Sequence, residues 1–157
     1  MKRVVVTGMG LISSIGNDLA TAKNRLRTLR NTVRVMPELT DIHGLNTHLA
    51  APAMDFNLPE HYTRKVLRTM GPVSVMSVYT AENALADAGL IGSDVLTSGR
   101  TGVAYGSSFG SAEGVADFFA INRTHAVGDI TSFSYLKLMP QTTAVNISLY
   151  FKQSMRH

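Results

Sequence analysis

A strand-like segment near the start of the chain runs directly into a glycine-rich turn. Residues 2–7 include three consecutive valines, and residues 8–10 begin and end with glycine. Runs of β-branched residues are typical of strands that are covered on both faces. A helix is expected next, with Asn17 or Asp18 as its N-cap and apolar side chains at helical spacing as far as residue 30. A buried strand that leads through a tight turn into a helix is the repeating unit of α/β proteins.

The same order of elements recurs later in the chain. Residues 101–105 predict a second buried strand, and Ser111 is expected to cap a helix that runs through Phe119. A largely apolar, deeply buried helix is expected at residues 72–88, and a last apolar helix at residues 142–151. This alternation predicts an α/β fold with parallel strands.

The predicted sheet is too small for the helices around it. Residues 31–57 show no long period and predict an irregular excursion with one short strand. An α/β domain of this length would normally have about four or five sheet strands. The sequence therefore predicts an incomplete sheet, in a chain that is a fragment of a larger protein.

Composition narrows the class of protein. Of the 157 residues, 45% are hydrophobic and 17% are charged, a balance that excludes intrinsic disorder. No run approaches the ~20 apolar residues that a membrane span needs, and a cytosolic location is the default.

The chain contains no cysteine, which excludes disulfides, thiolate metal sites and a cysteine nucleophile within it. The formal net charge of +4 favours anionic partners.

Two glycine motifs each have a catalytic and a structural interpretation. Residues 106–110 fit the G-x-S-x-G turn on which α/β-hydrolases carry their nucleophile, here Ser108. Asp129 and His157 would be the acid and the histidine, although the remaining residues leave no room for the strands that normally deliver them. The turn at residues 8–10 resembles a dinucleotide-binding fingerprint but lacks its third glycine. Sharp backbone turns, the later one beside a buried pocket, are the favoured interpretation of both motifs.

The histidines show no spacing that is typical of a metal site. No H-x-x-x-H pair is present, and no carboxylates accompany the histidines in a zinc-binding pattern. We therefore expect solvated or loop histidines at all five positions, which are His43, His48, His61, His125 and His157.

Three cations without acidic neighbours lie on an expected helical turn at residues 62–70. Arg64 and Arg68 are four residues apart and share a helix face, with Lys65 beside them. Such a cluster can bind a phosphate or an acidic helix. The alternative interpretation is a solvated helix face.

Taken together, these segments resemble the N-terminal part of the β-ketoacyl-[acyl-carrier-protein] synthases, which have the thiolase-like fold. The resemblance extends from Met1 to about Lys152. It implies an α/β fold that is the N-terminal half of a layered α/β/α structure with an incomplete sheet. The residues that carry it are Lys2-Arg3-Val4-Val5-Val6-Thr7-Gly8-Met9-Gly10 with Ser13, Ile15, Gly16 and Asn17, then Asp55-Phe56, Arg64-Lys65-Val66-Leu67-Arg68-Thr69-Met70, Ala84-Leu85-Ala86-Asp87-Ala88-Gly89-Leu90, Thr101-Gly102-Val103 and Gly106-Ser107.

The resemblance implies an acyltransferase that elongates carrier-bound acyl chains by decarboxylative Claisen condensation with a malonyl carrier. In this family a cysteine takes the acyl group, two histidines assist decarboxylation, and no metal or organic cofactor takes part. Arg64, Lys65 and Arg68 match the family's docking patch for the acidic helix of the acyl carrier protein. Phe109 matches a gate residue at the acyl pocket, and Ser108 lies beside it. The implied assembly is a cytoplasmic homodimer or heterodimer that does not bind nucleic acid.

The end of the chain departs from the family pattern. Residues 1–152 match the N-terminal domain, whereas residues 153–157 form an atypical tail without the strand and glycine turn that the family has there. Without the cysteine and the two histidines, the chain is expected to be inactive by itself. Two alternatives remain, which are a non-catalytic carrier-binding partner of a complete synthase subunit and a serine hydrolase that uses Ser108. The pathway stays open between fatty-acid synthesis and polyketide or polyene synthesis.

Overall fold

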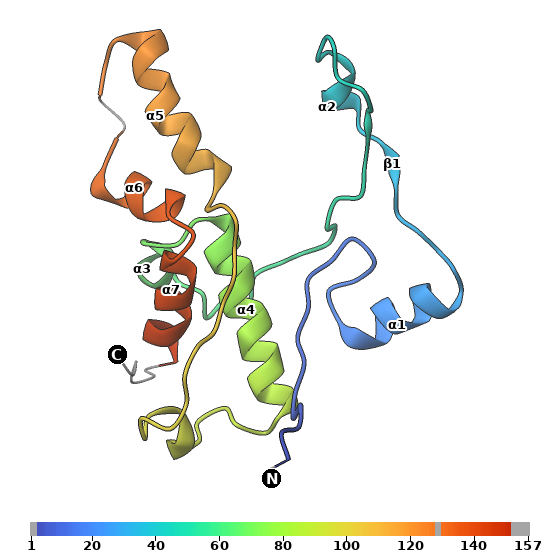
Figure 1. Cartoon of the computed structure of the whole chain (residues 1–157), viewed down its shortest axis with the longest axis vertical. Coiled ribbons are helices and arrows are strands. Elements are labelled where there is room, and N and C mark those ends of the chain that lie inside the picture. The colour runs from blue at the N-terminus through green and yellow to red at the C-terminus, as the bar shows by residue number, and fades with distance from the viewer. Residues whose placement is uncertain (1–2, 128–129, 152–157) are drawn as a thin grey trace. The chain divides into compact units, whose positions relative to one another are not determined.

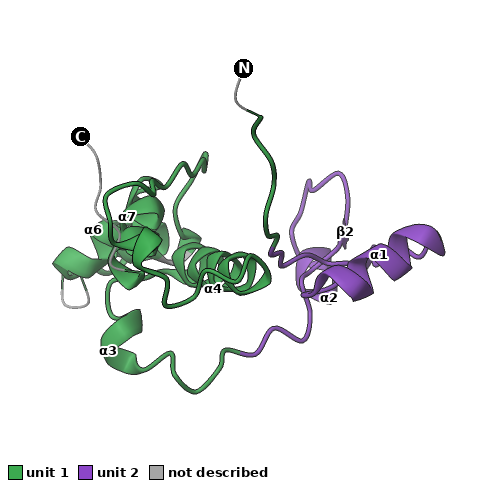
Figure 2. Cartoon of the chain, turned by 90° about the horizontal axis from the view of Figure 1, so that it is seen from below, with its two compact units in different colours: residues 1–9, 58–157 green, residues 10–57 purple. Residues whose placement is uncertain are grey.

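The computed structural model describes residues 3–127 and 130–151. The chain forms two compact units, which Figure 2 shows in different colours. Unit 1 contains residues 1–9 and 58–157, and unit 2 contains residues 10–57.

Helix α1 of unit 2 spans Leu19–Arg27 and begins at the predicted N-cap. The Asp18 carboxylate accepts hydrogen bonds from the Thr21 backbone N–H at 2.8 Å and from the Thr21 hydroxyl at 2.7 Å. These bonds lower the pKa of Asp18, because they stabilise its charged form. The helix ends at Arg27 rather than at residue 30, and Leu29 takes a left-handed backbone conformation with φ of 53° that cannot continue it.

The excursion in unit 2 contains a short antiparallel pair of strands. Strand β1 (Arg34–Val35) pairs with β2 (Leu49–Ala50), so that Arg34 lies opposite Ala50. Helix α2 (Pro37–Thr40) lies in the connection and begins with a proline, whose fixed φ suits the first helical position. The sequence predicted one short strand here, and the structure has two.

Unit 1 is built from helices that pack in two pairs. Helix α4 packs along α7, and α5 packs along α6 (Figure 1). The predicted helices that begin near residues 72, 111 and 142 are confirmed, whereas α6 lies between the last two of them, where no helix was predicted. In chain order the helices are α3 (Arg64–Leu67), α4 (Pro72–Asp87), the 3-10 helix η1 (Asp94–Leu96), α5 (Ala112–Thr124), α6 (Ser132–Leu138) and α7 (Thr142–Tyr150).

The core of unit 1 lies where α4 faces α7. Val78 of α4 has no exposed surface, and Tyr62, Met70 and Ile147 pack around it. Only Ser74 and Val78 are buried among the 16 residues of α4, so the expectation of a deeply buried helix is wrong for most of its length. Among the described residues, no helix is both long enough and apolar enough to cross a membrane.

Neither of the two predicted buried strands is a strand in the described part of the chain. Residues 3–7 form no ladder, and the Val4 side chain is 96% exposed. Residues 101–105 also form no ladder, although Val103 packs against the core of unit 1. A strand requires a hydrogen-bonded neighbour, and the described residues offer no strand besides β1 and β2. Both strand predictions are therefore wrong for these residues, because the segments have no strand to pair with.

The first prediction concerns the α4–α7 core. Val78→Ala should lower the free energy of unfolding by about 2 kcal/mol, because the substitution removes buried methyl groups and leaves a cavity. Val4→Ala makes the same chemical change at an exposed side chain and should alter it by less than about 0.5 kcal/mol. Urea denaturation followed by circular dichroism measures both values. Equal effects at the two positions would contradict the core that we describe.

Candidate functional site

The predicted basic residues lie on a single exposed helical turn of unit 1. Helix α3 contains Arg64 and Lys65, and Arg68 follows as its C-cap with helical φ and ψ, so that Arg64 and Arg68 keep their four-residue spacing. All three side chains are exposed, and none forms an ion pair with any described residue. The Arg68 guanidinium lies 4.7 Å from the centre of the Phe133 ring on α6, which is a favourable cation–π distance. We refer to Arg64, Lys65 and Arg68 as the basic turn.

Contacts with the core hold the basic turn at its C-terminal side. The Thr69 hydroxyl donates a hydrogen bond of 3.1 Å to Asn146 Oδ1 on α7. Met70, the next residue, is buried in the core around Val78. The chain therefore enters the core two residues after Arg68, the last cation of the basic turn.

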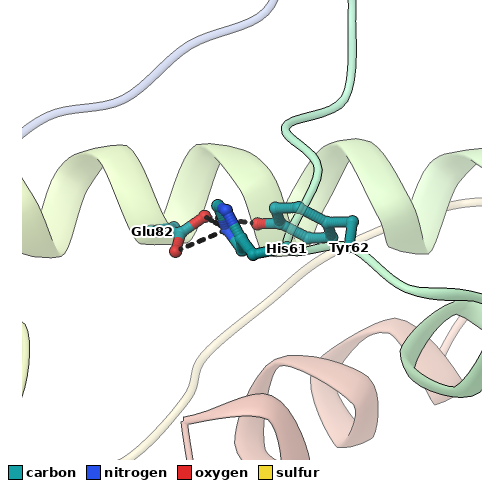
Figure 3. Close-up of polar contacts among 3 residues, drawn as sticks. All are labelled: His61, Tyr62 and Glu82. Atoms are coloured by element: carbon teal, nitrogen blue, oxygen red, sulfur yellow. Dashed lines mark hydrogen bonds and ion pairs between the residues drawn. The ribbon is translucent and has the colours of Figure 1, made fainter.

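A polar network that the sequence did not predict lies at the N-terminal side of the basic turn (Figure 3). The Tyr62 hydroxyl donates a hydrogen bond of 2.6 Å to Glu82 Oε2 on α4. The His61 Nε2 atom lies 3.1 Å from each oxygen of the same carboxylate. His61 is about half exposed, as expected of a loop histidine, but its carboxylate partner lies 21 residues away in the chain, where local spacing gives no signal.

Burial and stacking set the chemistry of the Tyr62 phenol. Burial, followed by the Glu82 carboxylate, raises the pKa of Tyr62 far above its ordinary value. The Tyr62 ring stacks on Tyr150 of α7, with ring centres 5.4 Å apart and planes 7° apart. Burial also raises the pKa of Tyr150. Tyr62 therefore remains protonated, and available as a donor to Glu82, throughout the neutral pH range.

The predicted gate residues lie in an exposed loop that ends against α6. Ser108 is exposed, and the Phe109 side chain is 52% exposed. The Ser107 hydroxyl donates a hydrogen bond of 2.5 Å to the Phe109 carbonyl oxygen. Gly110 is buried against the backbone of Leu138, at a distance that leaves no room for a Cβ atom. The gate loop, residues 106–111, therefore depends on the second glycine of the motif, Gly110.

Ser111 connects the gate loop with the first turn of α4. It occupies the N-cap position of α5, as predicted, but its hydroxyl makes no capping bond to that helix. Its Oγ atom instead accepts a hydrogen bond of 3.4 Å from the Val73 N–H of α4. Because α4 begins four residues after Arg68, the gate loop and the basic turn lie at the same end of α4.

The described clefts lie away from the gate loop. One cleft of about 440 Å³ in unit 1 is lined by residues of α4, η1 and α7, and another of about 690 Å³ is formed within unit 2. Ser108 and Phe109 line neither cleft. The expectation of a buried pocket beside this loop is therefore not met by either of them.

The serine hydrolase interpretation gains no partner residue for Ser108. Its hydroxyl makes no hydrogen bond with any described residue, and residues 101–105 do not form the strand that a nucleophile elbow requires. Asp129 and His157 lie outside the described residues. Within the described ranges, no three histidine, aspartate or glutamate side chains come together in a way that could hold a metal ion.

The family of the chain follows from its match to a known domain. Residues 1–154 match the family described as β-ketoacyl synthase, N-terminal domain. The chain belongs to the β-ketoacyl synthase family. Two curated enzymes named 3-oxoacyl-[acyl-carrier-protein] synthase 1 are similar to this synthase domain. The one from Haemophilus influenzae is 30% identical over 153 residues, which cover 97% of this chain and 37% of the relative. The one from Escherichia coli is 35% identical over 111 residues, which cover 71% and 27%.

Solved structures support the same fold. A crystal structure of a β-ketoacyl synthase from Burkholderia phymatum matches 99% of this chain and 38% of its own, with a TM-score of 0.90 and 44% identity. A type II polyketide ketosynthase in complex with its acyl-carrier protein matches 97% of this chain and 40% of its own, with a TM-score of 0.72, and at 22% identity it supports the fold alone. The expected fold class, the N-terminal half of a thiolase-like α/β fold with an incomplete sheet, is confirmed. The chain spans less than two fifths of the length of the curated synthases that it matches.

The second prediction tests the close approach at Gly110. Gly110→Ala should lower the free energy of unfolding by about 1–3 kcal/mol, because the new Cβ atom would force the gate loop away from α6. Gly106→Ala is the matched control, since a Cβ atom at Gly106 meets no other atom within 4 Å. Thermal unfolding of both variants measures the difference. A Gly106 variant as unstable as the Gly110 variant would argue against this packing.

The third prediction concerns alkaline pH. The pKa of Tyr62 is 10.0 in the absence of the fold and higher in the folded chain, so the unfolded chain loses this proton first. The contribution of protonated Tyr62 to the free energy of unfolding is therefore complete below about pH 10, and it declines as the pH rises further. Tyr62→Phe keeps the ring and removes the ionisable group, which should flatten this part of the decline. Urea midpoints between about pH 8 and pH 11 measure both proteins, and parallel curves would contradict the prediction.

Proposed function

We propose that this chain supplies the carrier-docking surface and the acyl-pocket gate of a β-ketoacyl synthase. The synthase would elongate acyl chains on an acyl carrier protein by decarboxylative condensation with a malonyl carrier. The observation that carries the proposal is the basic turn, whose three cations are exposed and lack acidic partners among the described residues of a chain from this family.

The charge of the basic turn supports an acidic protein partner. Exposed cations that no neighbouring carboxylate neutralises attract an anionic surface and orient its approach. Contacts on both sides of the turn, at Tyr62 and at Thr69, hold it at a defined place on unit 1. One structural relative is a ketosynthase that was solved together with its acyl-carrier protein, which supports the same class of partner for this chain.

The position of the gate loop supports a role for Phe109 and Ser108 at the entrance of the acyl pocket. Ser111 attaches this loop to the first turn of α4, directly after the basic turn. A carrier that docks on the basic turn would thus deliver its acyl thioester close to Phe109. The exposed ring would limit or gate entry of the acyl chain, as the family resemblance suggests.

We assign no catalytic residue within this chain. The covalent step needs a nucleophile, and the chain has no cysteine. Residues 1–152 would form the N-terminal synthase domain, residues 153–157 would be an atypical tail, and the 157-residue chain alone would be inactive. The complete synthase would be a cytoplasmic dimer that needs no cofactor and acts in fatty-acid or polyketide synthesis. A non-catalytic partner of a complete synthase subunit would use the same basic turn.

The fourth prediction tests carrier docking. Arg64→Glu combined with Arg68→Glu should weaken binding of a bacterial holo-acyl carrier protein by about tenfold or more, because two attractive contacts become repulsive. Binding by the unmodified chain should also weaken as NaCl is raised from about 50 to 300 mM. Isothermal titration calorimetry measures both effects. A condensation assay in which the chain is mixed with a complete synthase would distinguish between two interpretations of the chain. In one it is a fragment of a synthase subunit, and in the other it is a non-catalytic partner of a complete subunit.

A matched control is available on α1. Lys23 and Arg27 are also exposed cations four residues apart on a helix, so Lys23→Glu with Arg27→Glu makes a similar change in charge elsewhere in the chain. This control should alter carrier binding by less than about twofold. If the two double variants weaken binding equally, the carrier recognises the overall charge and the docking proposal fails.

A further inference from the structure

The Glu82 carboxylate connects α4 with the segment that leads into α3. It belongs to α4, it accepts a hydrogen bond from Tyr62, and it lies within hydrogen-bond distance of His61 (Figure 3). Tyr62 in turn stacks on Tyr150 of α7. Glu82 therefore ties the segment that leads into α3 to the α4–α7 pair.

The basic turn needs an external anchor because α3 is very short. Its four residues, Arg64–Leu67, form a single turn, and a single turn fixes several dihedral angles for few hydrogen bonds. The N-cap residue Thr63 adds no side-chain hydrogen bond to the helix. The conformation of the turn therefore depends on what holds the residues before and after it.

The two sides of the turn are anchored by different chemistry. After the turn, Thr69 bonds to Asn146 and Met70 enters the core. Before the turn, the Tyr62 ring is buried, and the two polar groups of residues 61 and 62 converge on Glu82. Loss of Glu82 would leave the Tyr62 hydroxyl buried without this acceptor.

We propose that Glu82 is a positioning residue for the carrier-docking turn, which it holds through Tyr62 and His61. Tyr62 supplies a hydrogen-bond donor, and His61 supplies a second contact with the same carboxylate. The inference rests on the proposed docking function, and it adds the residues that keep the docking cations in place. Glu82 itself does not touch the carrier.

The fifth prediction is tested by hydrogen–deuterium exchange of the full chain at neutral pH. Glu82→Gln and Tyr62→Phe should each raise exchange of the amides of residues 63–70 by about threefold to tenfold, because each removes or weakens a bond of the network. Glu60→Gln is the matched control, since it neutralises an exposed carboxylate in the same segment without touching the network. It should leave exchange of residues 63–70 unchanged.

The pattern of exchange decides whether Glu82 positions the turn or only stabilises the fold. Faster exchange that is confined to residues 63–70 supports the proposal. Equally faster exchange throughout α4 and α7 overturns it, as does no change at residues 63–70.

Carrier titrations separate this inference from the docking function on which it rests. If docking is correct, Glu82→Gln should weaken carrier binding by about twofold to tenfold, with Glu60→Gln as the reference. If the Arg64 and Arg68 double variant binds the carrier normally, the docking function fails, while the exchange data still decide whether Glu82 holds the turn. If docking holds but Glu82→Gln binds like Glu60→Gln, the positioning role is overturned.

Discussion

The packing of α4 against α7 is the contact on which the rest of unit 1 depends. Val78 is fully buried there beside Ile147, and the hydroxyls of Ser74 and Thr143 meet 3.1 Å apart. The segment around the basic turn packs on this contact through Tyr62 and Met70, and it hydrogen-bonds to both helices, to Glu82 on α4 and to Asn146 on α7. A displacement of one helix relative to the other would therefore pull the two ends of the turn apart.

Local signals in the sequence predicted the helices well and the sheet poorly. Asp18 and Pro72 begin α1 and α4 as expected, because an N-cap carboxylate and an N-terminal proline act within a single turn. Helix α6 was missed even though Thr131 and Ser134 form a capping box, since its seven residues are too few for a periodic pattern. The valines of residues 2–7 have the composition of a strand, but pairing depends on partner strands that the described residues do not contain.

In the candidate site, too, the sequence predicted what is local in the chain and missed the contacts between distant residues. The cations of the basic turn are neighbours in sequence, so their shared location followed from helical spacing alone. The partner of His61 lies 21 residues away, and Phe133, under the Arg68 guanidinium, belongs to the helix that was missed. Contacts of this kind arise only from tertiary packing, which brings together residues whose separation in the chain carries no period.

Two small hydroxyl side chains at the centre of the α4–α7 contact join positions that are 69 residues apart. A change at Ser74 alone would leave the buried Thr143 hydroxyl without this partner, and a larger side chain would force the helices apart. An apolar pair of matching volume would satisfy both requirements only if the two residues changed together. Positions 74 and 143 should therefore covary among related synthases, although they are far apart in the gene.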